Sequence, residues 1–209
     1  MLIEALPSRR TTEFVQWFVD GSELIDGRCR TKAYALFHSS NLGGMAPGTV
    51  RALRQIHAYL FGGLYDFAGQ IRTVNLAKGN FVFATARFLD QTLMQIENMP
   101  HETFDEIVDK YVEMNVAHPF REGNGRAMRI WLDLMLKQSL KRCVDWSQID
   151  KTSYLAAMAE SPWSSSKIRA LLRGAPTEKI DDREIFMKGI DYSYYYESDD
   201  LALDPTQTQ

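Results

Sequence analysis

One short segment of the chain concentrates residue types that handle phosphate chemistry. Residues 118–126 read HPFREGNGR. The glycines let the backbone approach a ligand closely. A glycine loop that leads into a helix also presents free N–H groups and a positive dipole end to an anion. Arg126 and Arg129 lie three residues apart, on the same side of the first turn of that helix. Since arginine suits phosphate oxygens, the segment predicts a polyanion site.

Two further side chains in this segment extend the prediction from binding to catalysis. His118 has the side chain best suited to act as a general base near neutral pH. Glu122 would repel a phosphate unless it holds Mg²⁺, which binds through one or two carboxylates together with phosphate oxygens. We therefore expect a site that uses a magnesium nucleotide for group transfer. For the remaining histidines, His38, His57 and His101, we expect structural roles.

The glycines taken alone leave a simpler interpretation open. A Gly-Asn-Gly turn followed by arginines is also typical of an ordinary connection between two helices. The phosphate-loop pattern GxxxxGK[ST] does not occur in the sequence. It is the combination of His118 and Glu122 with the two arginines that favours a nucleotide site.

Helices must position this segment. Apolar residues recur at helical spacing over residues 49–61 and 103–117. Residues 126–141 are apolar almost all round, which is typical of the central helix of a bundle. Further helices are expected at residues 148–160, 165–172 and 181–197. Residues 70–86 are instead rich in β-branched and aromatic residues around a central Lys-Gly-Asn, which predicts a hairpin. The expected fold is all-α, a helical bundle with one small β-hairpin.

The composition excludes several classes of protein. The chain has 209 residues, a net charge of −3 and a pI of about 5.8, so no overall basic field points to nucleic acid. The N-terminus lacks the apolar core of a signal peptide, and no apolar stretch is long enough to predict a membrane span. Cys29 and Cys143 have no metal-site spacing and are expected as free thiols. These features indicate a cytoplasmic protein without a membrane or direct nucleic-acid partner.

Three segments resemble one known family. Residues 118–129, HPFREGNGRAMR, resemble the signature HxFx[DE]GNGRxxR of the Fic family at every defined position. Residues 64–75, LYDFAGQIRTVN, resemble the entry into the family's hairpin, called the flap. Residues 193–198, SYYYES, resemble the inhibitory motif [ST]xxxE[GN] on the C-terminal helix of small single-domain members, known as class III. Ser198 departs from that motif, and we expect an altered helix cap rather than lost inhibition. The resemblance covers residues 52–198 and implies a Fic-like helical bundle with a flap.

The resemblance implies a protein adenylyltransferase, which transfers AMP from ATP to a Tyr, Thr or Ser hydroxyl of a target protein and releases pyrophosphate. It implies that His118 is the general base and that Glu122 holds Mg²⁺ across the α- and β-phosphates. The implied phosphate contacts are Gly123, Asn124 and Gly125 for the α-phosphate, and Arg126 and Arg129 for the β- and γ-phosphates.

The adenine and the target would contact other segments. The candidates for the adenine pocket are Tyr154, Leu155, Met158 and Asn115. Plain core packing is the alternative for all four. Family flaps hold the target segment by adding it as a strand, which implicates Leu76 and Lys78 in target binding, and Lys78 also in nucleotide binding. An ordinary solvated turn lysine is the alternative for Lys78.

The C-terminal motif implies a switch. Ser193 and Glu197 are four residues apart and lie on one helix face. In related proteins the inhibitory glutamate pairs with the second arginine of the signature, which is Arg129 here. A carboxylate there would remove a γ-phosphate anchor and turn ATP out of line for attack. We expect an N-terminal helical region at residues 1–47, a catalytic core at 48–180, an inhibitory helix at 181–198 and a flexible tail at 199–209.

Other functions stay open. Removal of AMP from a modified target needs the same kind of site, with the inhibitory glutamate positioning a water. Some family members are kinases, but their loop carries Lys where this chain has Gly125, which favours AMP transfer. A nucleotide-sensing regulatory module is the non-enzymatic alternative. His118 and Glu122 argue against it, because binding alone does not need a base.

The expected partners are ATP and a target protein. Some small bacterial Fic toxins modify type II topoisomerases, so a topoisomerase subunit is a target by analogy alone. Self-modification at Tyr194 and a homo-oligomer are further hypotheses.

Overall fold

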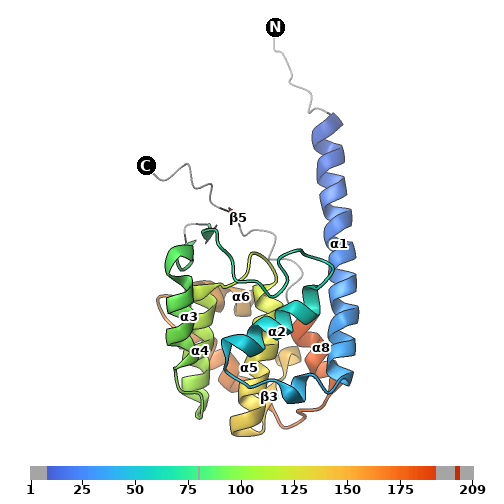
Figure 1. The fold of residues 1–209 in the computed structure, drawn as a ribbon. Coiled ribbons are helices and arrows are strands. Elements are labelled where there is room, and N and C mark those ends of the chain that lie inside the picture. Colours follow the sequence, from blue (N-terminus) through green and yellow to red (C-terminus); the bar gives the residue numbers. More distant parts are fainter. Residues whose placement is uncertain (1–8, 80, 192–200, 203–209) are drawn as a thin grey trace.

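We describe the fold from a computed structural model of the chain, which describes residues 9–79, 81–191 and 201–202 (Figure 1). Of residues 9–23 and 201–202, only the backbone is described. The α-helices are α1 (Arg9–His38), α2 (Val50–Phe61), α3 (Leu89–Glu97), α4 (Phe104–Ala117), α5 (Asn124–Leu140), α6 (Lys151–Glu160), α7 (Ser166–Gly174) and α8 (Arg183–Asp191). The 3₁₀ helices are η1 (Leu42–Gly44), η2 (Ala86–Phe88) and η3 (Trp146–Gln148). The strands are β1 (Leu76–Lys78), β2 (Phe81–Val82), β3 (Cys143–Val144), β4 (Pro176–Thr177) and β5 (Leu201–Ala202).

The central helix of the bundle is α5. It packs against α4 and α2, and also against α8 and β3. Nearly all its side chains from Asn124 to Leu136 are buried, as expected for a helix that is apolar almost all round. Because the glycine loop leads directly into α5, a buried central helix carries the predicted anion site.

Local signals define where the flanking helices begin. Thr49 caps α2, and its hydroxyl accepts a hydrogen bond from the Ala52 N–H. Thr103 and Glu106 form a capping box at the start of α4, in which each side chain accepts a bond from the other residue's backbone. The α4 helix therefore has a fixed start, and its last residue, Ala117, directly precedes His118.

The N-terminal helix α1 packs against α8 and α2, and its first part extends beyond the rest of the fold in Figure 1. In its second part, Cys29, Ala33 and Leu36 are fully buried. The second part of α1 therefore contributes to the core.

Two small antiparallel sheets accompany the helices. In the first, β1 pairs with β2 on one edge and with β5 on the other, with Leu76 opposite Ala202 and Ala77 opposite Leu201. In the second, β3 pairs with β4. The β1–β2 pair confirms the hairpin expected within residues 70–86. The second sheet was not expected, and residues 201–202, expected within a flexible tail, instead form a strand.

The structure confirms the all-α class and the helices expected from periodicity, with ends that differ by a few residues. It adds α3, which the sequence analysis missed. The last expected helix, at residues 181–197, begins at Arg183 and is described as far as Asp191; residues 192–200 lie outside the described part of the chain. Among the described residues, no helix is long and apolar enough to span a membrane.

Candidate active site

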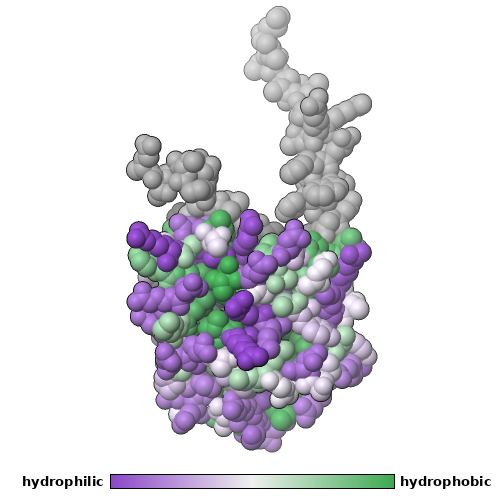
Figure 2. All heavy atoms as spheres, in the orientation of Figure 1, coloured by the Kyte–Doolittle hydropathy of each residue, from purple (hydrophilic) through white to green (hydrophobic). Residues whose placement is uncertain are grey.

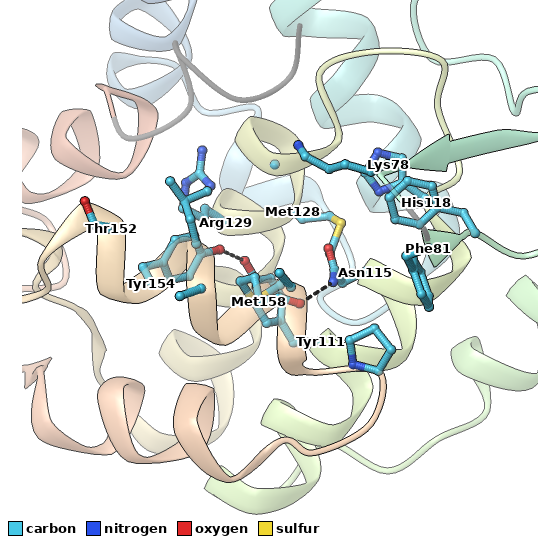
Figure 3. Close-up of a pocket in the computed structure, with 16 residues that line it drawn as sticks. Lys78, Phe81, Tyr111, Asn115, His118, Met128, Arg129, Thr152, Tyr154 and Met158 are labelled. Atoms are coloured by element: carbon cyan, nitrogen blue, oxygen red, sulfur yellow. Dashed lines mark hydrogen bonds between the residues drawn. The ribbon is translucent and has the colours of Figure 1, made fainter. Parts of the chain in front are cut away.

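The predicted loop borders a cavity of about 430 Å³. Its walls come from the hairpin, from α4 and the start of α5, and from α6. It brings together eight predicted site residues: Lys78, Asn115, His118, Gly125, Arg129, Tyr154, Leu155 and Met158. Residues that the sequence analysis did not name include Phe81, Phe83, Tyr111, Met128 and Thr152. In Figure 3, Lys78 and His118 lie on one side of this cavity and Arg129 on the other. Figure 2 shows an apolar patch left of the centre of the displayed face, bordered by hydrophilic residues.

His118 ends α4 in a left-handed backbone conformation, with φ 48° and ψ 65°. Its ring stacks on Phe83 of the hairpin, with centroids 3.9 Å apart. The side chain is only 8% exposed and lines the cavity. The turn at His118 therefore directs the imidazole away from the axis of α4 and toward the space that the hairpin covers.

The loop before α5 depends on a glycine at position 123. Gly123 has φ 79°, a conformation that residues with a Cβ rarely adopt. A Cβ at this position would also lie 2.4 Å from the Phe61 ring. Asn124 closes the loop, because its Oδ1 accepts from the Phe120 N–H and its Nδ2 donates to the Phe120 carbonyl. Both polar ends of the Asn124 side chain are thus engaged in shaping the loop.

His57 is fully buried and contacts this loop through its ring. Its Nδ1 accepts a hydrogen bond from the Gly69 N–H, so the proton lies on Nε2, which donates to the Glu122 carbonyl at 2.8 Å. Its ring also stacks on Phe120, with centroids 3.8 Å apart. The structural role expected for His57 is confirmed, and it joins the loop to the segment that leads into the hairpin.

Arg126 and Glu122 face each other at the start of α5. The Nη2 of Arg126 lies 3.7 Å from Glu122 Oε1, and its Nη1 donates to Asp26 Oδ1 of α1 at 2.9 Å. The guanidinium also lies over the Phe61 ring. Glu122 Oε1 accepts a bond from the Gly123 N–H, and the Glu122 side chain is 23% exposed. Asp26 was not predicted, because it lies one hundred positions before Arg126 and belongs to no recognisable sequence motif.

Arg129 lies at the far end of the cavity, beside α8. Its Nε donates to the Gly189 carbonyl at 2.5 Å. The guanidinium lies over the rings of Trp146 and Tyr154. Its Nη2 is buried and makes no hydrogen bond to any residue that the structure describes.

Asp133 lies one turn further along α5 and accepts a hydrogen bond from the Val144 N–H. Burial of the Asp133 carboxyl raises its pKa to about 6. A carboxyl with this pKa is half protonated near pH 6, and Asp133 was not predicted from the sequence.

The apolar end of the cavity lies between α4 and α6. The hydroxyls of Tyr111 and Tyr154 are hydrogen bonded at 2.6 Å, and burial raises the pKa of Tyr111 well above its usual value. Asn115 Nδ2 lies 3.4 Å from the Met158 carbonyl and from Ser161 Oγ (Figure 3). Since a main-chain carbonyl can only accept, the Asn115 amide nitrogen must face it.

The hairpin closes the cavity on one side. Lys78 and Phe81 line the cavity, and Trp163, after α6, packs edge-on against Phe81. Leu76 is buried and lines a separate, open groove next to Arg121. The two flap residues that the sequence analysis grouped together therefore face different spaces. Ser193, Tyr194 and Glu197 lie outside the described residues.

The fold and site together define a helical bundle with a glycine loop at the start of its central helix and a histidine facing the same cavity. The chain belongs to the Fic/DOC family, which it matches over residues 47–136. It is 31% identical over 147 residues to the protein adenylyltransferase VbhT of Bartonella schoenbuchensis, a match covering 64% of this chain and 30% of that protein. It is 30% identical over 135 residues to the probable protein adenylyltransferase Fic of Salmonella typhimurium, a match covering 59% of this chain and 67% of that protein.

Solved structures share the fold. The N-terminal Fic domain of an effector protein from Bartonella sp. AR 15-3 has a TM-score of 0.62 at 16% identity, covering 75% of this chain and 84% of that one. A Fic domain from Bartonella quintana with bound ADP has a TM-score of 0.60 at 18% identity, covering 79% and 89%. At these identities the likeness establishes the fold, which is the Fic-like bundle that the sequence predicted.

Proposed function

We propose that this protein is an adenylyltransferase that moves AMP from ATP to a Tyr, Thr or Ser hydroxyl of a target protein. The observation that carries the proposal is that one cavity is bordered by His118, by Gly125 at the start of α5 and by Arg129. A histidine can act as a base and a helix N-terminus favours anions, so their position on the same cavity supports the proposal. The relatives named protein adenylyltransferase support the same chemistry.

The proposed reaction is an in-line displacement at the α-phosphorus. His118 takes the proton from the target hydroxyl, whose oxygen forms a bond to the α-phosphorus as the bond to the bridging oxygen breaks and pyrophosphate leaves. The main-chain N–H of Gly125 contacts the α-phosphate, while Gly123 and the Asn124 side chain, bonded to Phe120, maintain the shape of the loop. Arg126 and Arg129 bind the outer phosphates. Catalysis is then positioning and charge stabilisation, without a covalent enzyme intermediate.

The residues fit a magnesium ion that arrives with the nucleotide. Glu122 is partly exposed, and the Gly123 N–H and the Arg126 guanidinium fix its carboxylate at the start of α5. Mg²⁺ commonly binds through one or two carboxylates plus substrate phosphates, so one carboxylate at this position is sufficient. When bound, the ion would neutralise negative charge on the phosphates.

The apolar end of the cavity suits the adenine. Tyr154 and Met158 are buried there, and Leu155 adds apolar surface. With its Nδ2 directed at the Met158 carbonyl, Asn115 can turn its oxygen toward the base or ribose. We assign these four residues to the nucleoside, and Lys78 and Leu76 to the flap that holds the target.

The same proposal includes inhibition by Glu197. The α8 helix passes Arg129, whose Nε already bonds to Gly189, and the chain continues from Asp191 toward the Ser193–Ser198 motif. Arg129 Nη2 is buried and has no hydrogen-bond partner among the described residues, so a carboxylate or a phosphate oxygen can satisfy it. Competition between these two acceptors would hold the enzyme inactive at rest.

The test uses labelled ATP. Purified Glu197→Gly protein, Mg²⁺ and ATP labelled at the α-phosphate are added to a bacterial lysate, and we expect a labelled protein band stronger than with the unaltered chain. The matched control carries His118→Ala as well, and we expect it to lose the band while it still binds ATP. Binding without any labelled band in the Glu197→Gly protein would instead favour a nucleotide-sensing module.

A further inference from the structure

The backbone of His118 needs external support. A residue with a Cβ is disfavoured at φ 48°, ψ 65°. His118 is also where α4 ends, so helical hydrogen bonds do not extend past it to fix its carbonyl group. The support must therefore come from another segment.

Arg72 supplies that support through its side chain. Its Nε donates to the His118 carbonyl at 2.7 Å, and its Nη2 donates to the Ala117 carbonyl at 3.0 Å. The same guanidinium holds both ends of the hairpin, because Nη1 donates to the Val74 carbonyl at 2.6 Å and Nη2 to the Ala84 carbonyl at 2.5 Å. One planar group thus joins the start and the end of the flap to the backbone of His118.

Main-chain hydrogen bonds extend the same junction. The Arg72 N–H donates to the Pro119 carbonyl at 2.9 Å, and the Ala84 N–H donates to the Val116 carbonyl at 3.0 Å. Residues 116–119 therefore lie between the two ends of the hairpin, bonded to both. A displacement of the Arg72 side chain would change the position of the flap relative to the histidine ring.

The chemistry of arginine explains why this residue type is present. Arg72 is 3% exposed, and within the described part of the chain its side-chain partners are all main-chain carbonyl oxygens. Burial lowers its pKa to about 10, which leaves it charged at neutral pH. A guanidinium offers five N–H groups in a fixed plane, whereas an ammonium offers three from one point. Lysine therefore cannot bond to all four carbonyls at once.

We propose that Arg72 is a positioning residue that sets the distance between the target segment on the flap and the base His118. The proposal rests on the AMP transfer proposed above. Arg72 does not contact the nucleotide in this role; it acts through the backbone of His118 and through the two ends of the hairpin.

The test compares Arg72→Lys and Arg72→Gln with Arg169→Lys, all in the Glu197→Gly protein. Arg169 is also a multidentate arginine, bonded to Asp105, Asp109 and Ser165 on α4 and before α7, away from the flap. We expect both Arg72 variants to lower the rate of AMP transfer at saturating ATP by about 100-fold, the loss typical of a displacement near 1 Å. The affinity for ATP should change by less than about threefold, because Arg72 bonds to none of the residues assigned to the nucleotide. Arg169→Lys should transfer AMP normally.

A second readout does not depend on activity. Hydrogen–deuterium exchange at the Ala84 amide should become faster in both Arg72 variants, while exchange in α5 stays slow. A loss of ATP affinity as large as the loss of transfer, or unchanged exchange at Ala84, overturns the positioning role. If the Glu197→Gly protein itself transfers no AMP, the proposed function fails, and the exchange experiment still decides whether Arg72 fixes the flap.

Discussion

The Nε of Arg129 donates a hydrogen bond of 2.5 Å to the main-chain carbonyl of Gly189. This contact joins the central helix α5 to the C-terminal helix α8, sixty positions later in the chain. Gly189 also packs against Trp146, since a Cβ at this position would lie 2.8 Å from the indole Nε1. The position of a predicted phosphate-binding arginine therefore depends on how closely α8 approaches Trp146.

Gly189→Ala should separate these helices. Overpacking of this kind typically costs about 1–3 kcal/mol, and the higher helix propensity of alanine offsets about 1 kcal/mol of it. We expect the melting temperature to fall by several degrees. The half-saturating ATP concentration should rise roughly fivefold, the effect of one hydrogen bond. Gly174→Ala is the matched control, because Gly174 also lies in a helix but a Cβ there would have no neighbour within 4 Å. This substitution should be neutral or slightly stabilising.

Gly123→Ala should abolish nucleotide binding while the bundle remains folded. The substitution combines a disfavoured φ of 79° with a 2.4 Å contact to the Phe61 ring, so the loop must move. The measurement is isothermal titration with ATP, supported by circular dichroism. Gly63→Ala has a similar φ of 73° without a close neighbour and should cost only about 1–2 kcal/mol of stability. ATP binding by Gly123→Ala at unchanged affinity would refute the role assigned to the loop.

The sequence predicted those parts of the fold whose causes are local. The apolar periodicity of α4 and α5 is visible in short stretches of sequence, and so is the Lys-Gly-Asn run that predicts the hairpin. Short elements escaped prediction. The helix α3 has nine residues, and β3 and β4 have two each, so their periodic signals are weak.

The sequence predicted which residues line the cavity, but not the hydrogen bonds and ion pairs that hold them. His118 and the glycine loop are contiguous in sequence, and the cavity beside them contains the residues expected for the nucleoside. The bonds that Asn124 makes to Phe120, and the ion pair of Arg126 with Asp26, depend on the tertiary arrangement. Arg72 lies within residues 64–75, which resemble the family's flap entry. Its four carbonyl partners, however, come from three separate segments of the chain, and no sequence motif predicts them.

Asp133 predicts a specific pH dependence of stability. Burial raises its pKa to about 6 in the folded state, against 3.8 for an ordinary aspartate. The folded state therefore binds more protons than the unfolded state between about pH 4 and 6, and the contribution of Asp133 to stability is lost as the pH rises through 6. The pKa difference of about 2 corresponds to about 3 kcal/mol. Asp133→Asn keeps an acceptor for the Val144 N–H and removes the charge.

Urea unfolding of both proteins at pH 4 and pH 7 measures this effect. The stability of Asp133→Asn relative to the unaltered chain should rise by up to about 3 kcal/mol between the two pH values. The comparison between two proteins cancels the opposite contributions of Asp105, Asp145 and Asp150, whose pKa values are lowered by hydrogen bonds. A constant difference between the proteins across this range would show that Asp133 does not titrate there.

Pairing of β5 with β1 predicts that the C-terminal segment competes with the target. Residues 201–202 lie antiparallel to β1, on the edge opposite β2. If a target segment adds to this edge as a strand, residues 201–202 must leave first. Removal of residues 199–209 from the Glu197→Gly protein should then raise AMP transfer about fivefold, the equivalent of about one net hydrogen bond. A Leu201→Pro, Ala202→Pro variant should do the same, since proline cannot donate to the ladder, whereas Thr208→Pro should have no effect. Faster amide exchange in β1 without any gain in transfer would show that β5 pairs with the flap but that targets bind elsewhere.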